Sequence, residues 1–146
     1  MAYNPTVQTR TSLPVTGYST LASGYYCISD AYNCNVNKPM DVVVEVEAYT
    51  TNAVAGNKQV VVFIQESLDG TNYRSGPTSS NVTTDEPDLR FLGTISMNTA
   101  SVTHRGTFAV SASLGYLPKY FKIVLKNDLG VALTAGAVYT SEIAVP

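Results

Sequence analysis

Alternation of apolar and polar residues along most of this chain is the feature that most restricts its fold. In the segment 119–126, Phe121, Ile123 and Leu125 fall on one side of an extended chain, and Lys122 and Lys126 fall on the other. No segment longer than about two helical turns has a helical period that alternation does not explain better. The sequence therefore predicts an all-β protein.

Two further segments alternate in the same way. Segment 88–98 and segment 107–114 are each predicted to be a strand with one buried face and one wet face. In segment 88–98, Gly93 lies on the inward side and predicts a bulge or a close approach. The inward residues are predicted to be Leu89, Phe91, Ile95 and Met97 in the first strand and Phe108, Val110, Ala112 and Leu114 in the second.

Segments 42–49 and 60–67 are apolar on both sides, which predicts central strands. The connection 50–58 is rich in turn formers, so we expect these two strands to pair as a hairpin. Further strands are predicted at 24–28, around Tyr73 and at 137–145, which gives about eight in all with no repeat period. This pattern predicts a single β-sandwich or jelly roll over residues 24–146.

Residues 1–23 are predicted to form an extended N-terminal arm. Pro5, Pro14 and Gly17 lie there among polar residues, and the segment has too little apolar content to form a core of its own. We expect such an arm to fray in an isolated monomer and to be held by a neighbouring subunit. Tyr3, Asn4 and Arg10 are the predicted contacts with that partner.

Composition argues against several classes of partner. Charged residues make up 14% of the chain, against about 25% in an average domain. A net charge of −2 argues against nucleic acid. The longest apolar run, Val60 to Ile64, is five residues, far short of the roughly 20 that cross a bilayer. With no basic or apolar leader at its start, the chain is predicted to be made in a cytoplasm and to have no membrane partner.

Residues that could carry catalysis or bind a metal are few. Glu45 and Glu47 share one strand face, where a solvated or interface-facing stripe is favoured over a catalytic pair. Asp85, Glu86 and Asp88 surround Pro87, where an acidic turn is favoured over a Ca²⁺ site.

The single histidine and the two cysteines offer little more. His104 is interpreted as a surface residue, and it cannot complete a zinc site with the two thiols. Cys27 and Cys34 are interpreted as reduced structural thiols, with a local disulfide left open. We therefore expect no enzymatic activity, no metal and no cofactor.

Two other patterns have alternative interpretations. Segment 67–73 contains Asp69 followed by Gly70, and it is interpreted as a structural turn fixed by side-chain bonds to backbone amides. The chain has ten tyrosines and no tryptophan. Tyr25, Tyr26, Tyr32 and Tyr49 are predicted to fill sheet faces or subunit contacts, and sugar stacking stays a less favoured alternative.

Three stretches between Val60 and Val145 carry a resemblance to known proteins: QESLDGTNYR, FLGTI and LPKYFKIVLKNDLGVALTAGAVYT. They resemble small β-sandwich structural proteins of tailed bacteriophages, especially capsid decoration or cement proteins. The resemblance covers a little over half of the chain, and residues 1–23 lie outside it. It brings no functional residues with it.

The resemblance implies a non-enzymatic virion protein on the outer surface of a phage head. Such a protein binds the major capsid protein as a homo-oligomer, a dimer or trimer, and ties capsomers together. A surface of low charge favours such contact independently, since buried unpaired charge is costly. The alternatives are a phage tail or fibre subunit and a carbohydrate-binding β-sandwich module.

Overall fold

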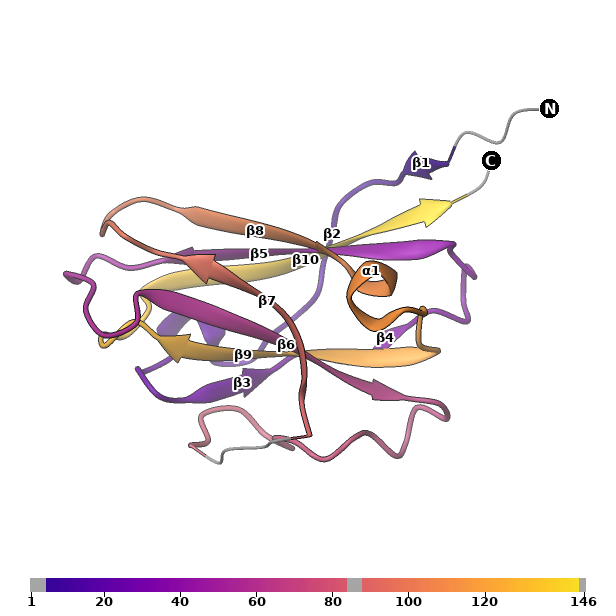
Figure 1. Cartoon of the computed structure of the whole chain (residues 1–146), viewed down its shortest axis with the longest axis horizontal. Helices are drawn as coiled ribbons and strands as arrows, with labels where there is room; N and C mark the ends of the chain where they lie inside the picture. The colour runs from indigo at the N-terminus through magenta and orange to yellow at the C-terminus, as the bar shows by residue number, and fades with distance from the viewer. Residues whose placement is uncertain (1–4, 84–87, 145–146) are drawn as a thin grey trace.

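The computed structural model describes residues 5–83 and 88–144, which form two antiparallel β-sheets packed face to face (Figure 1). The first sheet contains β8 (His104–Ala109), β5 (Asp41–Tyr49) and β10 (Ala135–Ala144), with β1 (Thr6–Val7) and β2 (Thr11–Ser12) both along the outer side of β10. The second contains β7 (Arg90–Ser96), β6 (Gln59–Ser67) and β9 (Tyr120–Asp128), with β3 (Tyr26–Ile28) and β4 (Tyr32–Asn33) along the outer side of β9. The predicted all-β sandwich is confirmed, with ten strands in the described part of the chain where about eight were expected.

Strands β5 and β6 lie in different sheets, so the prediction that they pair as a hairpin is wrong. Each is central in its own sheet: β5 lies between β8 and β10, and β6 lies between β7 and β9. Neither therefore has a free hydrogen-bonding edge for the other. Their valines and isoleucine meet across the core instead, and the connection 50–58 crosses between the layers. There the Ala55 N–H donates to the Leu129 carbonyl at 2.8 Å, which ties this crossing to the one between β9 and β10.

A β-bulge in β7 reverses its alternation. Pairing with β6 shifts register between Phe91 and Gly93, which leaves Leu92 as the extra residue. Leu92 is buried and Phe91 is 59% exposed, so the predicted inward position of Phe91 is wrong. Ile95 and Met97 are buried as predicted. The bulge expected at Gly93 is confirmed at the preceding residue, Leu92.

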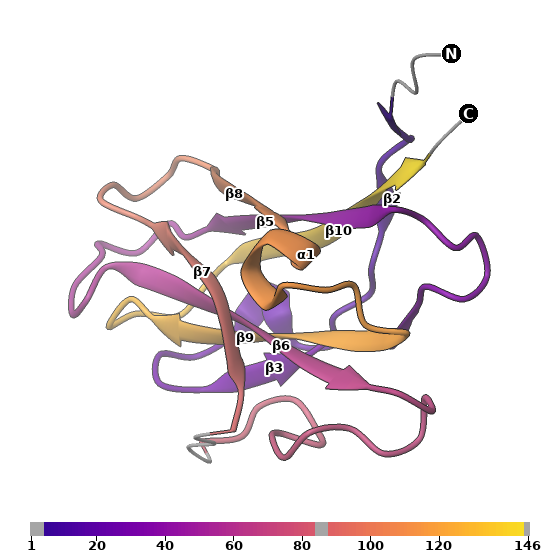
Figure 2. The same cartoon turned by 45° about the vertical axis from the view of Figure 1, so that its right-hand side comes forward.

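The predicted strand 107–114 ends early, because α1 (Val110–Leu114) replaces its second half. Val110 and Leu114 are buried and Ala112 is exposed, as expected for one helical turn that places residues four apart on the same side. Gly115, with a φ of 83°, ends the turn in a left-handed conformation. Figure 2 shows α1 at the front of the view, between the two layers.

Much of the N-terminal segment belongs to the sandwich. β1 and β2 pair with β10 of the same chain, and the Leu13 N–H donates to the Val138 carbonyl at 2.8 Å. Leu13, Tyr18 and Leu21 are buried in the core, Tyr18 within the 3-10 helix η1 (Tyr18–Thr20). The structure thus differs from an arm that needs a neighbouring subunit for order. Leu13, Tyr18 and Leu21 reach the common core, and the backbone of the segment bonds to β10.

Two glycines let the sheets approach each other along the β7–β8 side. Gly93 on β7 and Gly106 on β8 both lie against the ring of Phe108. A Cβ atom at Gly93 would lie 2.1 Å from Phe108 Cε1, and one at Gly106 would lie 2.8 Å from Phe108 Cζ. The ring therefore fills a space that only glycine at both positions leaves open.

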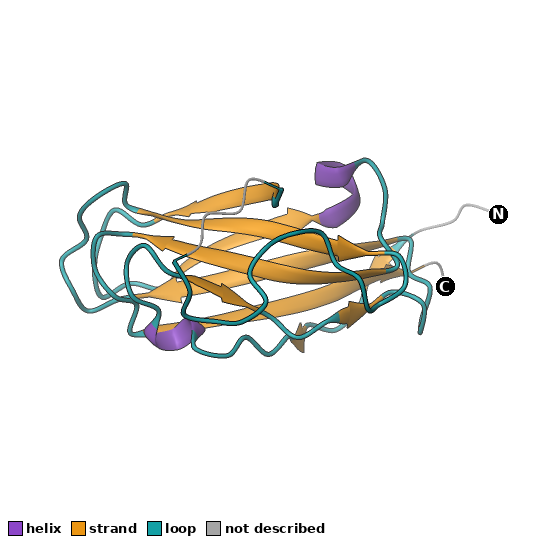
Figure 3. Ribbon diagram, turned by 90° about the horizontal axis from the view of Figure 1, so that it is seen from below, coloured by secondary structure: helices purple, strands orange, loops and turns teal. Residues whose placement is uncertain are grey.

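The long segment after β6 covers the outer face of the second sheet. Val82 pairs with Tyr26, and Ser80 Oγ accepts a hydrogen bond from the Ile28 N–H at 3.2 Å. Figure 3, seen from below, shows loops crossing over the strands of this sheet. This cover explains why Gln65, which is not on the core side of β6, is only 3% exposed.

Candidate functional site

The sequence candidates for chemistry lie apart from one another. The described residues contain no group of three His, Cys, Asp or Glu side chains that could hold a metal ion. His104, half-buried at the start of β8, places its Nε2 3.1 Å from the Thr99 carbonyl oxygen. Of the acidic turn, Asp85 and Glu86 fall outside the described residues, and Asp88 pairs with Arg74 at 2.8 Å.

Both thiols are free and buried, as the sequence interpretation expected. Burial raises the pKa of Cys27 and of Cys34 to about 12. Because the thiolate is the reactive form, neither side chain can act as a nucleophile near neutral pH. In the part of the chain that the structure describes, no helix is long and apolar enough to span a membrane.

Four charged side chains form a network on the outer face of the first sheet, which we call the Arg10 cluster: Arg10, Glu45, Glu47 and Arg105. Arg10 bonds to Glu45 and lies 3.2 Å from Glu47, and Arg105 binds Glu47 at 2.9 Å. The Arg10 guanidinium also stacks 3.8 Å from the ring centroid of Tyr139. Partial burial alone would raise the pKa of Glu47, but hydrogen bonds from Arg105 and Arg10 outweigh it and lower that pKa. The Glu47 carboxylate is therefore held as an anion, which does not suit a catalytic acid.

The predicted partner contacts are only partly visible. Tyr3 and Asn4 fall outside the described residues. Arg10 is about half exposed and bonds to Glu45 and Glu47 of its own chain. Its contact with a neighbouring subunit stays a prediction.

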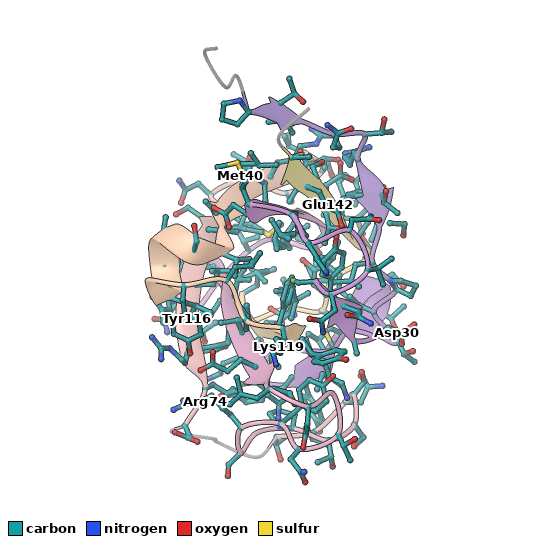
Figure 4. The ribbon with its side chains drawn as sticks, turned by 90° about the vertical axis from the view of Figure 1, so that its right-hand side faces the viewer. Asp30, Met40, Arg74, Tyr116, Lys119 and Glu142 are labelled. Carbon is teal, nitrogen blue, oxygen red and sulfur yellow. The ribbon has the colours of Figure 1, made fainter. Side chains whose placement is uncertain are left out.

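Three exposed apolar side chains belong to segments that bond to the end of β10, and we call this set the terminal patch: Val7, Val36 and Met40. They are 66%, 72% and 55% exposed. Val7 pairs with Ile143, and the Met40 N–H donates to the Ile143 carbonyl at 2.8 Å. Figure 4 labels Met40 beside Glu142, which binds Asn37, the residue after Val36, at 3.0 Å. The patch is thus held by the last residues of β10.

A second charged cluster lies at the end of β6. Glu66, whose side chain is 11% exposed, accepts a hydrogen bond from the Tyr116 hydroxyl and lies 3.2 Å from Arg74 and 3.7 Å from Arg90. The bond to Glu66 raises the pKa of Tyr116. Beside it is a hollow of about 510 Å³ that reaches from Tyr116 to Tyr73. Sequence reasoning missed this cluster, because its members come from separate elements without a common spacing.

The turn after β6 is built as the sequence predicts. The Asp69 carboxylate accepts hydrogen bonds from the backbone of Thr71 at 2.8 Å and Asn72 at 2.7 Å, and Gly70 has a φ of 77°. The backbone bond from Asn72, then that from Thr71, lowers the pKa of Asp69 well below its usual range. Asp69 thus fixes the path of the chain toward Tyr73.

The comparisons with known proteins add no relative. No protein-family model matches the chain, and no curated protein matches it. The arrangement of side chains is therefore the basis on which a function is proposed.

Proposed function

We propose that this chain is a non-enzymatic structural protein of a phage particle, which binds the major capsid protein on the outer surface of the head. The terminal patch is the observation that carries this proposal. Its three apolar side chains are more than half exposed, and their segments all bond to the last residues of β10. Contiguous exposed apolar surface marks sites that contact other proteins.

Two other features support permanent contact. Side chains of residues 5–12 are exposed, while the backbone of this segment bonds to β10. In the Arg10 cluster, each carboxylate already has an arginine partner. Covering this face with another protein therefore leaves no carboxylate of the cluster unpaired, and the desolvation cost stays low.

The test adds purified protein to capsids that lack it and measures bound protein and resistance to heat. The wild type is expected to bind and to raise the disassembly temperature. Val7→Asp and Met40→Glu are expected to weaken binding at least about tenfold, because each places a charge in an apolar contact. Val102→Asp is the matched control, since Val102 is 51% exposed but lies in the β7–β8 connection.

Failure of the wild type to bind such capsids contradicts the proposal. Equal binding by all three variants contradicts the role of the terminal patch. Copy number separates the alternative of a tail or fibre subunit: a cement protein approaches the copy number of the capsid protein or a simple fraction of it, while a tail subunit does not.

A further inference from the structure

Three hollows adjoin one another where the segment 68–80 runs over the second sheet. The first, of about 510 Å³, lies at the end of β6; the second, of about 260 Å³, lies on the outer face of the sheet; the third, of about 390 Å³, lies beside β3. The first and second share Tyr73 and Arg74, and the second and third share Thr78 and Lys122. We call this row the groove. Figure 4 labels Tyr116 and Arg74 from the first hollow and Asp30 from the third, all at one end of the molecule.

Two buried polar atoms at the middle hollow have no hydrogen-bond partner among the described residues. They are Gln65 Oε1 and the Tyr73 hydroxyl. Gln65 is 3% exposed and lines this hollow, and its Nε2 already donates to the Arg74 carbonyl. A buried polar atom without a partner destabilises the fold. Both residues line the middle hollow, so a ligand bound there with hydroxyl or amide groups would be the nearest source of partners for these atoms.

Lys122 supplies a third polar group. It lies directly opposite Gln65 in the pairing of β9 with β6, and its Nζ is 4.5 Å from the ring centroid of Tyr73. Within the described ranges, no carboxylate lies within ion-pair distance of its ammonium group. Its donors are therefore available to a ligand in the second or third hollow.

The chain is shaped in advance around the middle hollow. Gly76 passes so close to Gln65 that a Cβ there would lie 3.0 Å from Gln65 Nε2. Tyr73 is held by its bridge to Ser67, whose hydroxyl also accepts a hydrogen bond from the Gly70 N–H at 3.0 Å. Because these groups are already in place, a ligand would bind without the cost of ordering them.

We propose that the groove is a binding site for an oligosaccharide, with about one sugar ring in each hollow. Hydroxyl-bearing side chains line the second and third hollows, and the rings of Tyr73 and Tyr116 line the first. Carboxylates of Glu66 and Asp69 at the first hollow disfavour a polyanion such as nucleic acid. β6 and β9 are paired on both sides, so no strand edge is free there for an extended peptide.

This binding would be an activity separate from capsid contact, since the terminal patch shares no residue with the groove. Tyr73→Phe is the sharpest variant. It removes a hydroxyl that has no partner in the described protein, so the fold is expected to be as stable as the wild type or more so. Tyr139→Phe is the matched control, because Tyr139 lies on the other sheet, against Arg10.

The experiment screens the full chain on an array of defined glycans of one to six sugar units. For the glycan that binds best, isothermal titration calorimetry then compares the variants. Tyr73→Phe is expected to weaken binding about three- to tenfold, with Tyr139→Phe unchanged. Lys122→Met is expected to weaken it by a similar factor. Trisaccharides and longer chains are expected to bind at least about tenfold more tightly than their monosaccharide, because they occupy more than one hollow.

Three outcomes would overturn the proposal. The first is no binding to any glycan on the array, which leaves the unpartnered atoms as sites of hydration. The second is binding that Tyr73→Phe and Lys122→Met leave unchanged. The third is equal affinity for a monosaccharide and its oligomers, which contradicts the row of three subsites. None of these outcomes bears on capsid binding.

Discussion

Replacing Gly93 by alanine tests whether close approach of the two sheets depends on glycine. The added Cβ would lie 2.1 Å from Cε1 and 2.6 Å from Cδ1 of Phe108, whereas carbon atoms in contact prefer about 3.5–4.0 Å. The ring would have to move by about 1 Å or more. Gly106 lies against the Cζ and Cε2 atoms of the same ring, so the ring has no free space on that side.

We expect a cost near the upper end of the range for overpacking, about 3 kcal/mol. For a domain of this size, that corresponds to a fall of about 6–12 °C in Tm. Urea unfolding followed by far-ultraviolet circular dichroism measures it, since the chain has no tryptophan. Ser96→Ala, at an exposed position of the same strand, is the control and is expected to change stability by less than about 0.5 kcal/mol.

A double-mutant cycle with Phe108→Ala isolates the contact. Without the ring, Gly93→Ala is expected to stabilise by about 0.5 kcal/mol, because alanine loses less backbone entropy than glycine in a strand. The sign of the effect should therefore reverse between the two backgrounds. An equal cost in both backgrounds, or a cost below about 0.5 kcal/mol in the wild type, would refute the reasoning.

Three further predictions concern buried or paired polar groups. Asn127→Leu should cost about 3 kcal/mol or more in urea unfolding, because the buried amide binds three backbone groups at 2.7–2.9 Å; a cost below about 1 kcal/mol would contradict this. The pKa values of the Cys27 and Cys34 thiols are about 12. At pH 8, these thiols should therefore react with a disulfide reagent at least about a hundredfold more slowly in the folded protein than in the protein unfolded by urea. Equal rates would show that the thiols are accessible. The lowered pKa of Glu47 stabilises the fold above the ordinary carboxyl pKa and loses that effect as pH falls below it. Glu47→Gln should therefore flatten the loss of stability between about pH 5 and pH 3, with Arg105→Gln acting in the same direction; an unchanged urea-midpoint profile would refute it.

Period-two alternation predicted most of the strands, because a strand with one buried face has apolar residues at every second position. The buried positions of β9 and the turn at Asp69 were predictable for this reason. Which strand pairs with which was not, because pairing uses backbone groups that every residue carries. The hairpin between β5 and β6 was a reasonable expectation from turn residues, and it failed for lack of a side-chain signal.

Other features depend on contacts between distant parts of the chain. Leu92 replaces Phe91 in the core because a bulge shifts the phase by one residue; Gly93 marked the bulge but not which neighbouring side chain would turn inward. Glu66 and Tyr116 meet only because α1 brings the chain back to the end of β6. Leu13 lies in a short segment without a regular apolar period, so its burial could not be inferred before β10 was in place.

The position of β10 has a consequence for how the chain folds during synthesis. β10 is the last of the described strands in chain order, and it lies between β5 and the N-terminal strands β1 and β2. Until residues 135–144 have left the ribosome, β1 and β2 have no partner strand, and the edge of β5 that pairs with β10 is open. Closing such distant pairings is slow. The nascent chain therefore presents an unpaired edge of β5 until β10 has been made, and such an edge can pair with another chain.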